Sequence, residues 1–561
     1  MHRPIYPVAG CLFGILLLQS CVTHNNPASE ADALELDLKK GALISCAPGE
    51  QQYGTLSFRI TAKPASRRAF ALGVKLLHSF EYDESEKVFA GIIDREPGCA
   101  MAYWGVAMSN FHALWAPPTE TELKKGARAV ARARAIRKKT DREAAYIEAI
   151  GAYFDNWTQS DHRTRTGRFE QAMSRLYERY PDDPEAAIFY ALALNAHADP
   201  ADKTYARQLK AGELLKGIYP GQPDHPGLVH YLIHTYDYPE LATQALTAAR
   251  RYASVAPSSA HALHMPSHIF TRLGLWEECI RSNRMSVESA QCYARGTGMK
   301  GRWDQELHGM DYLMYAYLQQ GDNRRAMEQW DSLRRFRAVE PAGLISAYAL
   351  AAIPARYVLE NRQWKEAAAL ATPLPEFPWQ RFPWQKAMVH FARFLGAVHT
   401  GQEAAAATEL TALKELRTAL EAQKDAYKAG QVAIQIRAAE AWMLFRQGRR
   451  EEAAARMQEA VTAEEQTGKH PVTPGEVLPA RELQGDLLME MERWPEALEA
   501  YEADLQAHPG RFNGLYGAAL AAQRSGRNEK ARSYFQQLLK VAAPGSDRAE
   551  LATARRYLEG R

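Results

Sequence analysis

The chain has 561 residues, which is too long for one ordinary core and long enough for several domains or one extended array. Lys and Arg number 69 against 66 Asp and Glu, which leaves a formal charge of +3. A charge so close to zero gives no support for nucleic acid or an anionic membrane surface as the main partner.

The N-terminal segment MHRPIYPVAGCLFGILLLQSC combines a short basic start with an apolar stretch that is too short for a transmembrane helix. Its end, Leu18-Gln19-Ser20-Cys21, resembles the lipobox of a bacterial lipoprotein signal. The resemblance implies that residues 1–20 are removed and that acylated Cys21 anchors the protein to a membrane outside the cytoplasm. Val22 favours the outer membrane, facing the periplasm, because retention in the inner membrane usually needs Asp there. A plain signal peptide or a weak anchor helix is the alternative.

Residues 21–64 lack clear helical periodicity and predict a tether behind the anchor, ending in an extended segment at YGTLSFRITA. If Cys11 leaves with the signal and Cys21 carries lipid, four cysteines remain: Cys46, Cys99, Cys279 and Cys292. Cys46 with Cys99 is the first pairing to test, because both lie beside Pro-Gly turns. Cys279 and Cys292 are not expected to bridge, because on one helix they would lie about 20 Å apart.

A recurring pattern begins near residue 65. In ALGVKLLHSFEYDESEKVFAGIIDREP, a helical apolar pattern leads to an aromatic turn at Tyr82, and a proline ends the second helix. The pattern returns in SHIFTRLGLWEECI, AYLQQGDNRRAMEQW, VLENRQWKEAAAL, LMEMERWPEALEAYEADLQAHP and AQRSGRNEKARSYFQQLL. From Ala497 to Ala531 the step is 34 residues.

These segments resemble tetratricopeptide repeats, in which a pair of helices recurs about every 34 residues. The resemblance implies an all-α fold, a tetratricopeptide-type α-solenoid of antiparallel helix pairs. Gly73, Gly485 and Ala497 fall where the two helices of a pair must approach closely. We predict two arrays, residues 65–370 and residues 385–561, and this pattern says nothing about activity.

Between the arrays, TPLPEFPWQRFPWQK interrupts the helices with prolines and repeats FPWQ. Its rings, Phe377, Trp379, Phe382 and Trp384, can form an aromatic contact patch or can pin an ordered loop to the solenoid. We favour the second interpretation, in which the rings have a structural role.

The first array is rich in histidine. Eight of the 17 histidines lie within one fifth of the chain: His197, His225, His230, His234, His261, His264, His268 and His308. An even spread would put about three there. Composition alone therefore marks this stretch as a candidate functional region.

Several of these histidines fall on one predicted helix face. Measured back from the turn residue of each repeat, they lie at offsets of 4, 8, 12 and 15 residues: His234 and His230 before Tyr238, His268, His264 and His261 before Trp276, and Asp311 and His308 before Asn323. Such steps stay within one stripe of a helix. The resemblance implies that this stripe lines the concave groove of the solenoid.

Histidines at i and i+4 can bind one metal ion, which makes His230 with His234 and His264 with His268 the predicted ligand pairs. A neighbouring helix about 10 Å away can supply more ligands. The further candidates are His197, His261, His308, Asp237 and Asp311. Imidazole ligands suit copper or zinc, and nearby Met265 would favour copper.

Three points stay open at this level. Pro266 interrupts HALHMPSH, so the helix there is either kinked or begins later, and we expect His230 and His234 to matter more than His261. The imidazoles can hold an organic ligand or a peptide in place of a metal. They can also satisfy one another as packed polar groups.

HYLIHTYDYPELA and HALHMPSHIFTRLGLW also resemble blocks in a group of largely uncharacterised bacterial tetratricopeptide proteins that carry AMAYWG near the start. That resemblance spans roughly residues 65 to 340 and implies a shared site without naming a substrate. The chain has no HExxH, GxSxG, Walker or Rossmann motif. We therefore do not expect a standard zinc protease or a nucleotide cofactor.

We expect a membrane-anchored, extracytoplasmic protein whose His-lined groove binds copper or zinc together with a ligand or partner. One alternative is a metal-dependent oxidase, oxygenase or hydrolase that uses the same histidines, with Asp237 or Asp311 as the base. Another is an interaction scaffold without metal that grips a peptide or protein. Because a solenoid site needs only its own repeats, removing the C-terminal array should leave metal affinity largely intact.

Overall fold

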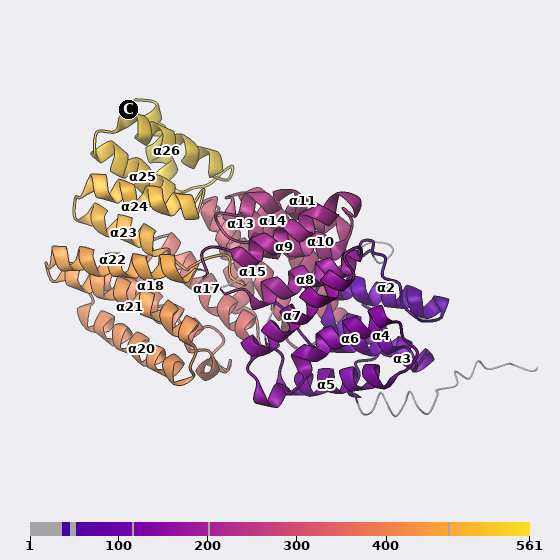
Figure 1. The fold of residues 1–561 in the computed structure, drawn as a ribbon. Helices are drawn as coiled ribbons and strands as arrows, with labels where there is room; N and C mark the ends of the chain where they lie inside the picture. Colours follow the sequence, from indigo (N-terminus) through magenta and orange to yellow (C-terminus); the bar gives the residue numbers. More distant parts are fainter. Residues whose placement is uncertain are drawn as a thin grey trace, which may run out of the picture.

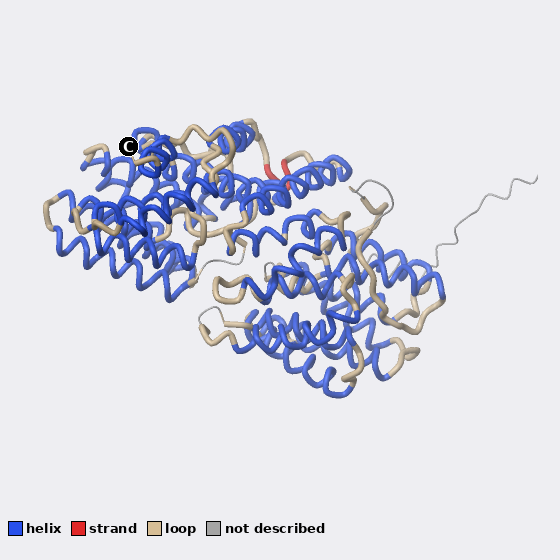
Figure 2. Tube along the Cα trace, turned by 90° about the horizontal axis from the view of Figure 1, so that it is seen from above, coloured by secondary structure: helices blue, strands red, loops and turns tan. Residues whose placement is uncertain are grey.

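The computed structural model describes residues 36–44, 46, 52–114, 117–199, 202–468 and 472–560, and helices dominate that part of the chain (Figure 2). The predicted lipobox with Cys21 lies outside the described residues. Within the described ranges, no helix has both the length and the apolar character needed to cross a membrane.

The elements of the N-terminal half are α2 Pro64–His78, α3 Tyr82–Arg95, α4 Ala100–Ser109, α5 Glu120–Ala135, α6 Asp141–Phe154, η1 Trp157–Gln159, α7 His162–Arg179, α8 Pro184–His197, α9 Ala206–Ile218, η2 Tyr219–Gly221, α10 Pro226–Thr235, η3 Ala242–Ala245, α11 Leu246–Val255, α12 Ala260–His264, α13 Pro266–Arg272 and α14 Trp276–Thr297. The central elements are β1 Arg302–Trp303, α15 Asp304–Gln319, α16 Asn323–Arg334, β2 Val339–Glu340, α17 Leu344–Glu360, α18 Trp364–Ala368, η4 Trp379–Arg381 and α19 Pro383–His399. The C-terminal helices are α20 Glu403–Ala422, α21 Ala426–Arg446, α22 Arg450–Thr467, α23 Ala480–Glu490, α24 Trp494–Ala507, α25 Phe512–Arg524, α26 Asn528–Val541 and α27 Ala549–Leu558. The two short strands pair in parallel, with Arg302 opposite Val339.

Each helix packs against the next one in the chain (Figure 1). Along much of the chain, helices two apart, such as α15 and α17, also touch each other. Small residues permit this spacing. A Cβ added to Gly73 would lie 2.7 Å from the ring of Phe89 on the partner helix, and one added to Gly485 would lie 2.6 Å from Tyr501. The predicted all-α solenoid of antiparallel helix pairs is confirmed.

The array folds back on itself at two places. Helix α2 contacts α10 eight helices later, and α25 contacts α15. At the second closure, buried Arg511 pairs with Glu360 and Glu482 at 2.8 Å each, and the Trp276 indole donates to the backbone oxygen of Gly510 at 2.9 Å. The first closure covers α10, which carries His230 and His234, and the second covers α15, which carries His308.

Residues 52–62, which we call the strap, pack across the first array. Tyr53, Phe58 and Ile60 are buried in the main core, and the Thr55 amide donates to the backbone oxygen of Asp224 at 2.9 Å. This described part of the predicted tether therefore belongs to the folded body. Apolar residues alternate along the segment, which allows one face of an extended chain to be buried.

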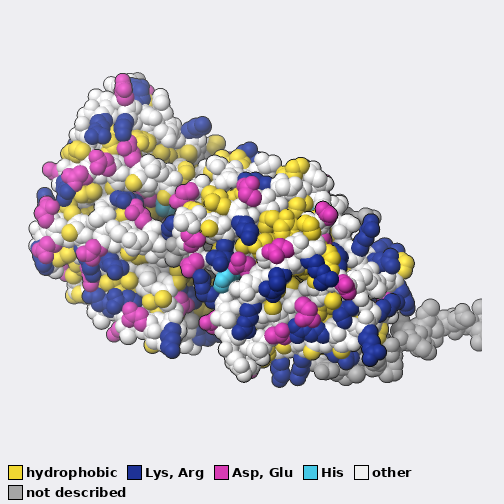
Figure 3. Space-filling view, viewed as in Figure 1, with side chains coloured by type: hydrophobic (Ala, Val, Ile, Leu, Met, Phe, Trp, Pro, Cys, Tyr) yellow, Lys and Arg dark blue, Asp and Glu magenta, His cyan; other side chains and the backbone are white. Residues whose placement is uncertain are grey.

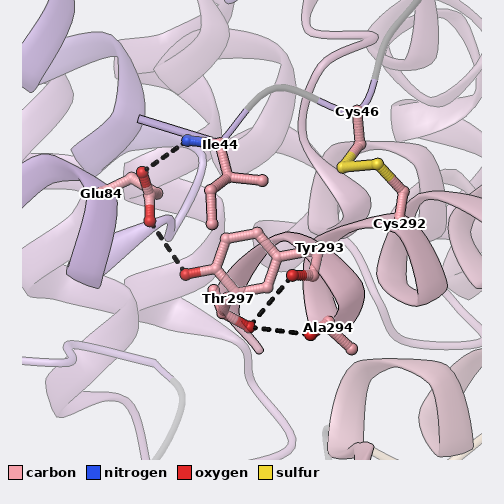
Figure 4. The surroundings of a disulfide bond; sticks show 7 residues. All are labelled: Ile44, Cys46, Glu84, Cys292, Tyr293, Ala294 and Thr297. Atoms are coloured by element: carbon pink, nitrogen blue, oxygen red, sulfur yellow. Dashed lines mark hydrogen bonds between the residues drawn. A yellow bond between two sulfur atoms is a disulfide. The ribbon is translucent and has the colours of Figure 1, made fainter. Parts of the chain in front are cut away.

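Cys46 forms a disulfide with Cys292, so the expected Cys46–Cys99 pairing is wrong (Figure 4). The reason is tertiary: the chain ahead of the strap runs beside α14, where Glu84 accepts hydrogen bonds from the Ile44 amide and the Tyr293 hydroxyl. Cys99 and Cys279 are buried free thiols. Cys279 and Cys292 lie on the same helix and do not bridge, as expected.

The proline-rich break between the predicted arrays is an ordered loop. Phe377, Trp379 and Trp384 are buried, and the Trp379 indole donates to the backbone oxygen of Pro373 at 3.0 Å. The rings therefore pin the loop to the solenoid, as the sequence favours. On the face drawn in Figure 3, basic and acidic side chains are interspersed, in keeping with the small net charge.

Candidate metal centre

Helix α10 places His230 and His234 one turn apart. Its start is fixed by His225, whose Nδ1 accepts from the amides of Gly227 and Leu228 at 3.1 and 3.4 Å. Pro226 fills the first helical position, where a missing N–H does no harm. Because the helix has no break between the two histidines, both rings project from the same face.

His261, His264 and His268 come from two short helices joined at Met265. Pro266 is the first residue of α13, and Met265 keeps right-handed helical angles. The helix is therefore divided at the proline, but the chain keeps the same direction through Met265. The Nε2 atoms of His264 and His268 lie 3.0 Å apart, so these two residues still share one face.

His230, His234 and His261 form the first triad. The Nε2 atom of His230 lies 3.1 Å from that of His234 and 3.1 Å from that of His261. Bonds of about 2.0–2.1 Å from a tetrahedral metal place two nitrogen ligands roughly 3.3 Å apart. The first triad therefore has the spacing of a three-imidazole metal site, and His261 belongs to it as closely as His234 does.

His264, His268 and His308 form the second triad, with His308 supplied by α15. One ligand atom from each ring lies within 4.8 Å of the others. The rings of His264 and His308 have centroids 4.0 Å apart, and those of His268 and His308 are 6.2 Å apart. Sequence spacing alone paired His264 with His268, and the packing of α15 adds the third imidazole.

Hydrogen bonds fix which ring nitrogen carries a lone pair in the second triad. The Asn283 amide nitrogen donates to the Cys279 carbonyl, so its Oδ1 faces His264 and accepts from Nδ1 at 2.6 Å. The Asp237 carboxylate accepts from Nδ1 of His268 at 2.9 Å. Both facing Nε2 atoms therefore carry lone pairs in the neutral rings. These two Nε2 atoms lie 3.0 Å apart, so one metal ion between them could accept both lone pairs.

The first triad follows the same rule at His230. Its Nδ1 donates to the backbone oxygen of His78 at 2.6 Å, which leaves the Nε2 lone pair directed at its two neighbours. Burial, reinforced by neighbouring imidazoles, lowers the pKa of His230 and of His261 well below the ordinary value. These rings are therefore neutral near pH 7, the form in which imidazole binds a metal.

The two triads abut. His234 and His268 have ring centroids 6.4 Å apart, and His261 and His264 have centroids 6.5 Å apart, close to the 6.2 Å found within the second triad. Five of the six rings are at most 5% exposed, and His234 is half-buried. The histidines thus form one buried cluster on the face that the sequence assigns to the groove, because the folded-back array covers it.

Aromatic side chains enclose both triads. The Phe80 ring lies 4.4 Å from His230 and stacks near His261, which closes the first triad from the direction of α2. The Tyr312 hydroxyl lies 3.3 Å from Nε2 of His268 in the second triad. Sequence reasoning missed both residues: Phe80 lies in a turn far from the first triad along the chain, and Tyr312 lies one turn after His308 on α15, where its i, i+4 spacing was a usable signal.

The other predicted ligands have different partners. Asp237 supports His268 from behind and also accepts from Arg272 Nε at 3.0 Å. Asp311 lies 3.7 Å from Arg356, and burial raises its pKa to about 6. His197 does not join either triad. It ends α8, and its Nδ1 lies 3.1 Å from the hydroxyl of Thr166 on α7.

A third group, His78, Glu185 and His225, lies behind the first triad. Glu185 accepts from His225 at 2.9 Å and lies 3.0 Å from Nε2 of His78. Burial opposes ionisation of Glu185, yet the two histidines hold its pKa below the usual range. His78 ends α2, and its backbone oxygen accepts from Nδ1 of His230. This network therefore orients the first triad, and its ring nitrogens already serve protein hydrogen bonds.

The C-terminal array covers the second triad. The backbone oxygen of Val472 lies 3.5 Å from the Tyr312 hydroxyl, and that of Gly475 accepts from Tyr348 at 2.9 Å and from Arg356 at 2.8 Å. These contacts join residues 472–475, which we call the covering segment, to helices α15 and α17. The surroundings of the second triad therefore include a residue 160 positions further along the chain, which the repeat pattern alone did not predict.

No protein-family model matches the chain, and no curated protein matches it. Among solved structures, a monomeric mutant of IFIT1 with Gppp-AAAA shares 10% identity over 78% of this chain and 90% of its own, with a TM-score of 0.34. Yeast Tom70 shares 9% identity over 88% of this chain and 96% of its own, with a TM-score of 0.32. With TM-scores this low, neither likeness carries an inference about this chain. Fold and site together define the class as an all-α, tetratricopeptide-type solenoid with a buried histidine cluster.

Proposed function

We propose that this protein is a lipid-anchored, extracytoplasmic solenoid that binds a transition metal, copper or zinc, in its buried histidine cluster. The observation that carries the proposal is the pair of facing Nε2 lone pairs of His264 and His268 at 3.0 Å, with both Nδ1 atoms held by oxygen acceptors. Outer acceptors of this kind orient metal-binding histidines in proteins.

The location outside the cytoplasm is part of the proposal. The lipobox ending at Cys21 and the Cys46–Cys292 disulfide both support an oxidising compartment. Acylation of Cys21 would place the folded body at the membrane surface, and Val22 favours the outer membrane. Mass spectrometry of the purified protein tests this part, because an acylated N-terminal Cys21 is expected and an unmodified Met1 would contradict it.

A ligand or protein partner is a further part of the proposed function. A cleft beside the covering segment is lined by Tyr348, Trp384, Gln431, Glu464 and Glu476. Its lining combines aromatic rings with carboxylates, and we propose it as the contact surface for a peptide or protein partner. Binding there would add to metal binding and does not replace it.

Metal content tests the central claim. The purified protein is equilibrated separately with copper and with zinc, freed of excess ions, and analysed for metal per chain. We expect at least one tightly held ion in the wild type and a large loss in the His230→Ala/His268→Ala double variant. The matched control is His197→Ala/His390→Ala, which removes two histidines outside both triads. Metal content near zero that the triad variant leaves unchanged would reject the proposal.

A further inference from the structure

We infer that the cluster holds a pair of copper ions, one in each triad, and that the pair binds dioxygen between them. This inference rests on the proposed metal-binding function and makes it more specific. It starts from the count of ligands: six imidazoles divide into two sets of three, each with an H-x3-H pair and one histidine from another helix.

The adjacency of the triads argues for a pair. Rings of different triads, His234 and His268, are 6.4 Å apart, while two rings of the same triad, His268 and His308, are 6.2 Å apart. Two ions bound in such neighbouring sets would be close enough to act together, as two-metal sites hold their ions about 3.5–4 Å apart. Three protein ligands for each ion also leave a coordination position open on each.

Charge favours copper over two divalent ions. In the described part of the chain, both groups consist of imidazoles, with no carboxylate among their ligand atoms. Two nearby acids already face a cation, Asp237 the side chain of Arg272 and Asp311 that of Arg356. Two buried divalent ions would therefore bring a large uncompensated charge, whereas two cuprous ions bring half as much. Imidazole is also a good copper ligand, and copper heads the affinity order of the divalent metals.

The charge of a site with two cuprous ions also suits the binding of dioxygen. Each cuprous ion gives up one electron, so the pair supplies the two electrons that reduce dioxygen to peroxide. Both ions become cupric, and the dianionic peroxide offsets the positive charge gained, so the net charge of the site is unchanged. The step needs no other reductant and no proton. The buried rings of Phe80 and Tyr252 around His230 and the C-terminal covering segment keep water away from the site.

Copper counting tests the pair. The protein is loaded with cuprous ion without oxygen, and copper per chain is measured for the wild type, His261→Ala in the first triad, His308→Ala in the second, and the control His197→Ala. We expect two ions in the wild type and the control, and one in each triad variant. Circular dichroism and thermal melting check that each variant folds. If a triad variant does not fold, His261→Gln or His308→Gln replaces it.

Oxidation by air provides the second readout. Two cupric ions coupled through a bridging ligand give no electron paramagnetic resonance signal, so we expect a silent wild type and a single-copper signal from His308→Ala. Two ions per chain with full signal would overturn the dioxygen-binding pair. One ion per chain would overturn the pair while the proposed metal-binding function stands. No bound metal of any kind would overturn both.

Discussion

The Nε2 atoms of His264 and His268 face each other at 3.0 Å, although a proline separates the two helices that carry them. Each ring is held from behind by one acceptor, Asn283 for His264 and Asp237 for His268. The position of the facing lone pairs therefore depends on residues that would not touch the metal.

Loss of the Asn283 acceptor should weaken metal binding. In Asn283→Ala, Nδ1 of His264 loses its oxygen partner, so the ring can rotate and exchange tautomers. We expect the dissociation constant to rise about 10- to 100-fold in a chelator competition titration. The control is Ser286→Ala, one turn further along α14, which removes a buried hydrogen bond to the Ala260 carbonyl without touching a triad ring. Equal affinity losses in both variants would show that Asn283 acts only through stability.

Metal affinity should resist mild acid. A protonated imidazole cannot bind a metal, and an ordinary histidine protonates as the pH falls through about 6.5. Burial holds the pKa of His230 and His261 well below that value, so protons compete with metal only at lower pH. We expect equilibrium dialysis to show little change in affinity from pH 8 to 6.5 and a steep decline below that range. A decline centred on pH 6.5 would indicate an exposed histidine surface.

Removing the C-terminal array should accelerate metal release. Truncation after residue 400 removes the backbone oxygens of Val472 and Gly475 that lie against Tyr312 and Arg356. Water then reaches the second triad, and we expect release to a chelator to become faster by about tenfold or more. Truncation after residue 527 is the control, because it keeps the covering segment. Equal release rates from both truncated proteins and the wild type would restore the independence that the repeat pattern suggests.

Close helix packing predicts a stability effect at Gly73. The added Cβ of Gly73→Ala would lie 2.7 Å from the buried Phe89 ring, so the two helices of the pair must separate. We expect a loss of about 1–3 kcal/mol in the free energy of unfolding, measured by denaturant titration. Gly91→Ala on the partner helix is the control. Its Cβ meets only the end of the Arg95 side chain at 3.5 Å, so helix propensity should leave it neutral or stabilising. A neutral Gly73→Ala would contradict the packing argument.

The amino-acid sequence determined the helix pairs and four of the six triad histidines. Local signals were enough for both, because apolar periodicity, turn residues and the small residues at Gly73 and Gly485 are read within one repeat. The H-x3-H pairs His230/His234 and His264/His268 were likewise visible, since residues four apart share a helix face. The sequence ranked His261 below these pairs. Its contact with His230 was not visible, because His230 lies on a different helix.

The tertiary structure decided everything that joins distant repeats. It paired Cys46 with Cys292, brought the His78 carbonyl to His230, and placed the covering segment at Val472 over Tyr312. None of these contacts leaves a periodic trace, because each depends on how the superhelix curls after many small rotations between neighbouring repeats. The curl also buried the histidines that the sequence assigns to the groove. Whether these histidines lie on the surface or in the interior was therefore decided by the path of the whole array, which no single repeat encodes.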